Sequence, residues 1–170
     1  MSASAHALIS LEPRFAEGIL NGTKLVELRR RPMRLGAGTT VWLYVKVPVG
    51  KVVGSVQVHA GHLLAPTTLW RRYGDVSGLS RAEFFDYFGG LRQGFALVLK
   101  RPTRLDVGVA LDELRMLNDG FQPPQFFQHL AGESALVSAL LQGGGSSLPQ
   151  SEKARHPGRA AAAATAASSA

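Results

Sequence analysis

The segment 51–64 constrains the fold most, because apolar side chains recur there at every second position. Val52, Gly54, Val56 and Val58 alternate there with Ser55, Gln57 and His59. A period of two is typical of a β-strand with one buried face. The apolar run 39–47 precedes it, and Pro48 to Gly50 form a turn signal between the two runs. The sequence therefore predicts two neighbouring strands of a meander.

Helices are expected in the connections between strands. Pro13 opens an amphipathic segment that stops at Asn21 and Gly22, and residues 65–74 also fit a short helix. Ser80 and Glu83 have the spacing of a capping box before a further helix. Further strands are expected at 7–11, 24–31 and 94–105, and a turn with a helical cap at 122–130. We predict an α+β fold in which the sheet closes into a small β-barrel, because closure removes exposed strand edges.

Composition divides the chain into three parts. Residues 1–132 carry the strands and helices described above and are predicted to form one domain. Residues 133–142 have leucine and valine at helical spacing and predict a short terminal helix. Residues 143–170 are rich in Gly, Ser and Ala, so they cannot bury enough apolar surface to offset the entropy of ordering. We expect this tail to be disordered.

Two absences narrow the class of protein. The chain contains no cysteine, which excludes disulfides, thiolate nucleophiles and cysteine-ligated zinc, and fits a reducing compartment. No apolar run approaches the roughly 20 residues that a membrane helix needs, and the first residues do not resemble a signal peptide. The expectation is a cytoplasmic protein that does not associate with a membrane.

The segment 22–31, GTKLVELRRR, concentrates charged groups on one predicted strand. Strand alternation places Glu27 and Arg29 on one face, and Lys24, Val26 and Leu28 on the other. The apolar pair selects the core face, so Glu27 and Arg29 should be neighbours on a concave surface. A guanidinium oriented by a carboxylate suits a phosphate or a base edge. The alternative is a solvated edge strand whose charges only oppose aggregation.

The formal charge of +7 is concentrated in clusters of basic residues, which favours polyanionic partners such as nucleic acid. A generally basic protein with no specific partner is the competing interpretation. The five histidines show no metal-ligand spacing: His59 and His62, for example, would face opposite sides of a strand. We therefore expect no metal and no cofactor.

The order of these segments resembles the ASCH family, the activating-signal-cointegrator homology domains, over residues 6–131. Its best signature is the arrangement GxKxxExR, here Gly22, Lys24, Glu27 and Arg29. The closest likeness is to a bacterial branch labelled predicted transcriptional regulators. The resemblance implies a PUA-like barrel with a cleft beside the first helix and the signature strand, which binds RNA or a modified nucleoside. The ligand-binding residues would then be Lys24, Glu27, Arg29, Arg30, Tyr44 and Lys46.

The resemblance also leaves an enzyme open. One branch hydrolyses N4-acetylcytidine with the signature lysine, a threonine three residues later and a distant glutamate. Here Glu27 stands at the threonine position, and the loop 75–79 has no glutamate. Another relative is a ribonuclease in which a tyrosine and a lysine are implicated, for which Tyr44 with Lys46 or Lys51 could be the counterparts. In either reaction Lys24 would be the reactive amine or the general base. Tyr44 or Trp70 could also stack on a base, although core packing is the commoner role.

Deletion of residues 143–170 should leave the melting temperature nearly unchanged, because this segment lacks apolar anchors. Thermal unfolding of the full and the truncated chain, followed by circular dichroism, measures the difference. A loss of several degrees on deletion would show that the tail packs on the domain.

Overall fold

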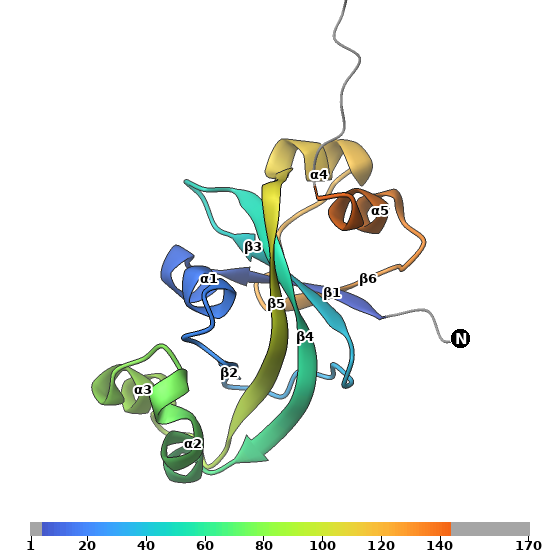
Figure 1. The fold of residues 1–170 in the computed structure, drawn as a ribbon. Coiled ribbons are helices and arrows are strands. Elements are labelled where there is room, and N and C mark those ends of the chain that lie inside the picture. The colour runs from blue at the N-terminus through green and yellow to red at the C-terminus, as the bar shows by residue number, and fades with distance from the viewer. Residues whose placement is uncertain (1–4, 144–170) are drawn as a thin grey trace, which may run out of the picture.

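The computed structural model describes residues 5–143, which form one strongly twisted sheet with helices packed at both of its ends (Figure 1). The predicted tail, apart from Gly143, lies outside the described residues. Six strands make the sheet, in the spatial order β2-β5-β4-β3-β1-β6. Their bounds are β1 His6–Leu11, β2 Val26–Arg29, β3 Thr40–Val45, β4 Lys51–Leu64, β5 Gly94–Ala110 and β6 Phe127–Leu130.

Antiparallel pairing dominates the sheet. The predicted meander is present: β3 pairs with β4 across the turn, and β4 continues into a long antiparallel ribbon with β5 (Figure 1). Only β1 and β3 run parallel within the described sheet, with Ile9 opposite Leu43. Helix α1 (Pro13–Leu20) lies in the connection that follows β1. Antiparallel strands can expose one face to water, which agrees with the alternation of buried and more exposed residues along β4.

The mixed α+β class is confirmed, but the predicted closure into a barrel is wrong. The sheet is open, and β2 and β6 are its two edges. The edge at β2 is short and is covered by helix α3 (Arg81–Tyr87) instead of another strand. The Tyr87 hydroxyl donates to the Leu28 carbonyl at 3.4 Å, and the Arg30 guanidinium donates to the Tyr87 carbonyl at 2.7 Å. Covering an edge in this way protects it without closing the sheet.

The other helices also follow local signals. Helix α1 and helix α2 (Pro66–Tyr73) each have a proline in the first turn, where the missing N–H costs nothing. The 3₁₀ helix η1 (Gly74–Val76) follows α2. The capping box of α3 is confirmed: Ser80 Oγ accepts from the Glu83 N–H at 3.2 Å, and a Glu83 carboxylate oxygen accepts from the Ser80 N–H at 2.8 Å.

Two elements near the C-terminal end differ from expectation. Residues 122–130 end in the strand β6, not in a helical cap, because Phe127 to Leu130 pair antiparallel with β1. Helix α4 (Leu111–Leu117) directly follows β5 and was not predicted. Helix α5 (Ala135–Leu141) lies where leucine and valine spacing indicates a helix. Strand β6 was not predicted because it pairs with β1, more than 100 residues away, and such pairing leaves no local pattern in the sequence.

The buried apolar residues form three clusters. The first packs α1 against one face of the sheet. The second lies on the opposite face of β1 and β3, around Trp42 and Tyr44, and includes Leu136 and Leu140 of α5. The third joins β2 to α2 and α3 around Phe84. The third cluster fixes the position of the signature strand relative to the two helices.

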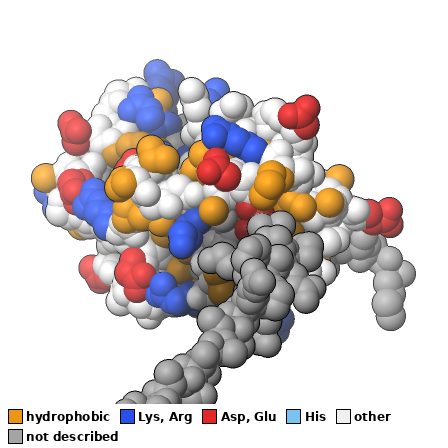
Figure 2. All heavy atoms as spheres, turned by 90° about the horizontal axis from the view of Figure 1, so that it is seen from above, with side chains coloured by type: hydrophobic (Ala, Val, Ile, Leu, Met, Phe, Trp, Pro, Cys, Tyr) orange, Lys and Arg blue, Asp and Glu red, His pale blue; other side chains and the backbone are white. Residues whose placement is uncertain are grey.

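The surface at the end of the molecule with α4 and α5 mixes charges of both signs with exposed apolar side chains (Figure 2). Met116 and Leu141 are exposed there. No helix within residues 5–143 is long and apolar enough to cross a membrane.

Phe84→Ala should destabilise the protein by about 3–5 kcal/mol, because Phe84 is fully buried and its removal leaves a cavity in the third cluster. Phe85→Ala is the matched control: Phe85 is only half-buried, and its loss should cost less than about 2 kcal/mol. Denaturant unfolding of both variants measures the two costs. Equal costs would contradict the packing described for α3.

Candidate functional site

A tight turn after α1 places Lys24 in the interior of the protein. Gly22 adopts a φ of 82°, a conformation that favours glycine. The Asn21 side-chain oxygen accepts from the Thr23 N–H at 3.0 Å, and the Gly18 carbonyl accepts from the Lys24 N–H at 2.9 Å. These bonds fix the backbone of Lys24 before β2 begins at Val26.

The Lys24 ammonium is held inside the protein by polar partners. The residue is 4 % exposed. Its Nζ donates to the Ser77 carbonyl at 2.6 Å and lies 3.5 Å from a Glu27 carboxylate oxygen. It also lies 5.0 Å from the centre of the Phe15 ring. A lysine is almost never buried without such partners, because the charge loses its hydration.

The loop after η1 is shaped to present the Ser77 carbonyl. Ser77 is fully buried, and its hydroxyl donates to the Gly74 carbonyl at 2.8 Å and accepts from the Leu79 N–H at 3.2 Å. Gly78 follows at a φ of 75°, and a Cβ there would lie 3.2 Å from Lys24 Cδ. The loop therefore approaches the lysine stem closely only because residue 78 has no side chain.

Glu27 and Arg29 stand beside Lys24. An Arg29 Nη lies 3.1 Å from a Glu27 carboxylate oxygen, and Arg29 Nε is buried with no hydrogen-bond partner within the described residues. Val26 and Leu28 are buried on the other side of the strand, against α2 and α3. The predicted alternation of side chains between the two faces of the strand is thus confirmed within β2. It fails for Lys24, which shares the side of Glu27, because Lys24 precedes the strand and does not follow its period.

These side chains line a pocket of about 420 Å³ between α1, β2 and α3. Its charged residues balance: four are basic and four are acidic, namely Arg14, Lys24, Arg29, Lys46, Glu12, Glu27, Glu83 and Asp86. Phe15, Leu28, Leu79 and Tyr87 add apolar or aromatic surface. A pocket of this size with convergent polar groups suits a small organic group better than a bare anion.

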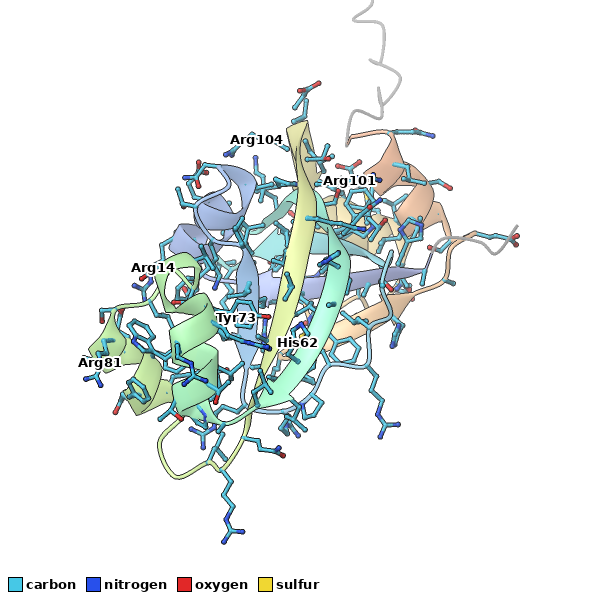
Figure 3. All side chains as sticks on the ribbon, turned by 60° about the horizontal axis from the view of Figure 1, so that its bottom comes forward. Arg14, His62, Tyr73, Arg81, Arg101 and Arg104 are labelled. Atoms are coloured by element: carbon cyan, nitrogen blue, oxygen red, sulfur yellow. The ribbon has the colours of Figure 1, made fainter. Side chains whose placement is uncertain are left out.

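Ion pairs at the rim join elements that are distant in sequence. Arg14 extends from α1 toward α3 (Figure 3), and its guanidinium lies 2.9 Å from the Glu83 carboxylate. Lys46 Nζ donates to Glu12 at 2.7 Å. Hydrogen bonds from Ser80, then from Arg14, lower the pKa of Glu83. Both pairs are half exposed, so they contribute little to stability and leave the rim adaptable.

Burial dominates the electrostatics of Lys24. Loss of hydration lowers the pKa of the Lys24 amine, the Glu27 carboxylate opposes this shift, and the guanidinium groups of Arg29 and Arg14 reinforce it. Burial also raises the pKa of the Tyr87 hydroxyl at the pocket wall. The site therefore combines a Lys24 amine that loses its proton more readily than usual with a Tyr87 hydroxyl that loses its proton less readily than usual.

The structure brings together four of the six residues predicted to bind a ligand. Lys24, Glu27, Arg29 and Lys46 line the pocket. Arg30 lies just outside it, donating to the Tyr87 carbonyl. Tyr44 does not take part, because it is buried in the second cluster on the opposite face of the sheet, where burial raises its pKa.

Trp70, the other candidate for stacking on a base, packs against Phe84 with ring centres 5.1 Å apart and does not line the pocket. Sequence reasoning also missed three contributors: Arg14, Tyr87 and the Ser77 carbonyl. Arg14 and Tyr87 lie in helices that look amphipathic and ordinary, and a carbonyl carries no residue signal. Within residues 5–143, no three His, Asp or Glu side chains gather closely enough to hold a metal ion.

Comparison with known proteins decides the family. No family model matches the chain. A curated ASCH domain-containing ribonuclease from Zymomonas mobilis is 37% identical over 140 residues, which is 80% of this chain and 93% of that protein. The chain belongs to the ASCH domain family. The crystal structure of ASCH from Zymomonas mobilis matches this ASCH domain with a TM-score of 0.76 at 34% identity, over 81% of this chain and 94% of that one.

Two weaker likenesses were also found. A hypothetical protein from Leishmania major shares the fold of this ASCH domain, with a TM-score of 0.51 at 15% identity over 82% of this chain and 93% of that one. The large ribosomal subunit protein uL22 of Ureaplasma parvum is 26% identical over 123 residues, which is 72% of this chain but only 38% of that protein.

Gly78→Ala should push Lys24 out of its buried position, because the added methyl group would meet the lysine stem and the backbone would be strained at positive φ. Gly90→Ala is the matched control: Gly90 has a φ of 76°, and no atom of residues 5–143 lies within 4 Å of its added Cβ. Both variants lose about 1–2 kcal/mol to backbone strain. Acylation of Lys24 by an amine-reactive reagent, quantified by mass spectrometry, should rise only in Gly78→Ala. Equal labelling in the two variants would contradict the close approach.

Proposed function

We propose that this ASCH domain binds single-stranded RNA or a modified nucleoside, with the base held in the pocket of Lys24, Glu27 and Arg29. The observation that carries the proposal is Arg29 Nε, a buried donor at the wall of this pocket that has no hydrogen-bond partner among residues 5–143. A buried donor of this kind normally has an acceptor, so a ligand is the natural partner. The carbonyl oxygens and ring nitrogens of a base are acceptors of the right type.

The neighbouring groups support a base as the ligand. Glu27 holds the Arg29 guanidinium through one Nη, which keeps the plane of the remaining donors fixed. Lys24 has three N–H donors and two protein partners, Ser77 and Glu27, so one donor is left for a ligand. The balance of acidic and basic residues in the pocket also suits an uncharged ring better than a phosphate. The ribonuclease relative makes RNA the first ligand class to test.

A catalytic role is the second candidate, and the lowered pKa of Lys24 favours it. A neutral Lys24 amine could accept the proton of a 2′-hydroxyl whose oxygen attacks the adjacent phosphorus, which is one route of RNA cleavage. In that route the P–O5′ bond breaks, the 5′-oxygen leaves with a proton from solvent, and a 2′,3′-cyclic phosphate is formed. Hydrolysis of N4-acetylcytidine has less support, because Glu27 replaces the threonine of that branch and the loop 75–79 carries no glutamate. The predicted cytoplasmic location belongs to the proposal as well, since an RNA ligand would be met there.

Lys24→Ala and Arg29→Lys should each weaken the binding of a fluorescent single-stranded oligoribonucleotide by about tenfold or more, because the first removes a buried charged donor and the second removes the guanidinium fork. Arg29→Lys keeps the charge but loses the fork and its Nε, so its effect tests geometry and not charge alone. Lys100→Ala removes an exposed cation on β5 and is the control, with little expected change. Fluorescence anisotropy measures the affinities. Unaltered binding in both folded pocket variants would refute the proposal.

Turnover separates the two candidates. Labelled RNA and N4-acetylcytidine are incubated with the protein, and cleavage or deacetylation is followed over a range of pH. If Lys24 is the base, the rate rises with pH as the amine loses its proton, with a midpoint below the ordinary value of 10.5. Cleavage that persists in Lys24→Ala but is lost in Tyr44→Phe would place the chemistry on the opposite face of the sheet. RNA binding without turnover supports the binding module.

A further inference from the structure

A second groove of about 430 Å³ adjoins the pocket. Six residues line it: Arg29, Arg30, Arg31, Tyr87, Leu91 and Phe126. Arg29 and Tyr87 line both hollows, so the pocket and the groove are neighbours that share a wall. The groove runs from the end of β2 toward the segment that precedes β6.

The two hollows differ in charge. Among the described residues that line the groove, three are arginines and none is acidic, whereas the pocket has equal numbers of acidic and basic residues. Neither Arg30 nor Arg31 has a carboxylate within 4.0 Å in the described part of the chain. Unpaired guanidinium groups that converge on one groove favour an anionic ligand.

The groove is also preorganised. The guanidinium carbons of Arg29 and Arg31 lie 5.7 Å and 5.2 Å from the centre of the Phe126 ring, so the ring orients both cations. Arg30 is fixed differently, by donating one Nη–H to the Tyr87 carbonyl at 2.7 Å. Each guanidinium keeps further N–H groups free for a phosphate, which accepts two parallel hydrogen bonds from such a fork.

We propose that this groove binds the phosphodiester backbone of the RNA strand whose base occupies the pocket. The inference rests on the proposed function and adds the path of the strand. Arg29 is the junction: one Nη contacts Glu27 in the pocket, and the guanidinium carbon faces Phe126 in the groove. In single-strand binders generally, a positively charged groove follows the backbone while other groups contact the bases, and the groove and the pocket could divide these two tasks in the same way.

The test compares a ligand with a backbone and one without. Affinities for a short single-stranded oligoribonucleotide and for the free nucleoside are measured over a series of salt concentrations. Arg31→Ala should weaken oligonucleotide binding about tenfold at low salt and reduce the slope of log K against log salt by about 0.7, the release of one phosphate contact. Nucleoside affinity should not change. Arg31→Lys keeps the charge and should restore most of the slope.

Arg81→Ala is the matched control. Arg81 is an exposed arginine at the start of α3, its guanidinium carbon is 5.1 Å from the Phe85 ring, and it points away from the sheet (Figure 3). Its removal changes the net charge equally and should leave the salt slope intact. If Arg31→Ala and Arg81→Ala behave alike while Lys24→Ala still weakens binding, the groove inference is overturned and the proposed function stands.

Two other outcomes have distinct meanings. If Lys24→Ala and Arg29→Lys leave both nucleoside and oligonucleotide affinity intact, the proposed function itself fails. If inorganic polyphosphate binds as tightly as the oligoribonucleotide and loses the same affinity in Arg31→Ala, the groove is a general anion site and its assignment to an RNA strand is overturned. A loss specific to the oligoribonucleotide supports the inference.

Discussion

Burial of the Lys24 ammonium is the constraint on which the site depends. A charge taken out of water needs compensating partners, and here they come from three separate parts of the chain. The Ser77 carbonyl arrives on the loop after η1, Glu27 on β2 and the Phe15 ring on α1. Gly78 permits the loop after η1 to approach the Lys24 side chain closely. Lys24 therefore contacts α1, β2 and the loop that follows η1. The pocket lies beside it, between α1, β2 and α3.

The same constraint explains how a base and a backbone could be received at adjoining places. Glu27 has to compensate Lys24, so it also neutralises the pocket and orients Arg29. Arg30 and Arg31, which follow Arg29, have no carboxylate within 4.0 Å among the described residues, and they line the groove with Phe126. A neutral pocket beside a cationic groove is a better match to one nucleotide of a strand than either hollow alone.

Local sequence patterns predicted much of the fold, and long-range pairing accounts for the errors. Alternation identified β4 and the buried pair Val26 and Leu28, and the capping box located α3. The open edges and β6 depend on contacts between distant segments, which leave no period in the sequence. At the site, the signature indicated Glu27 and Arg29 correctly as neighbours. The signature could not show that Tyr44 faces the opposite side of the sheet. The sequence of a single strand specifies neither its pairing partners nor the twist of the sheet.

Both proposals require that a nucleotide occupies the pocket around Lys24 and Arg29. A crystal structure of the protein with a short single-stranded oligoribonucleotide tests it most directly. We expect a base in the pocket, an acceptor of that base within hydrogen-bond distance of Arg29 Nε, and the adjoining phosphate against Arg30 or Arg31. RNA bound on the face that buries Tyr44, with no nucleotide in the pocket, would contradict it.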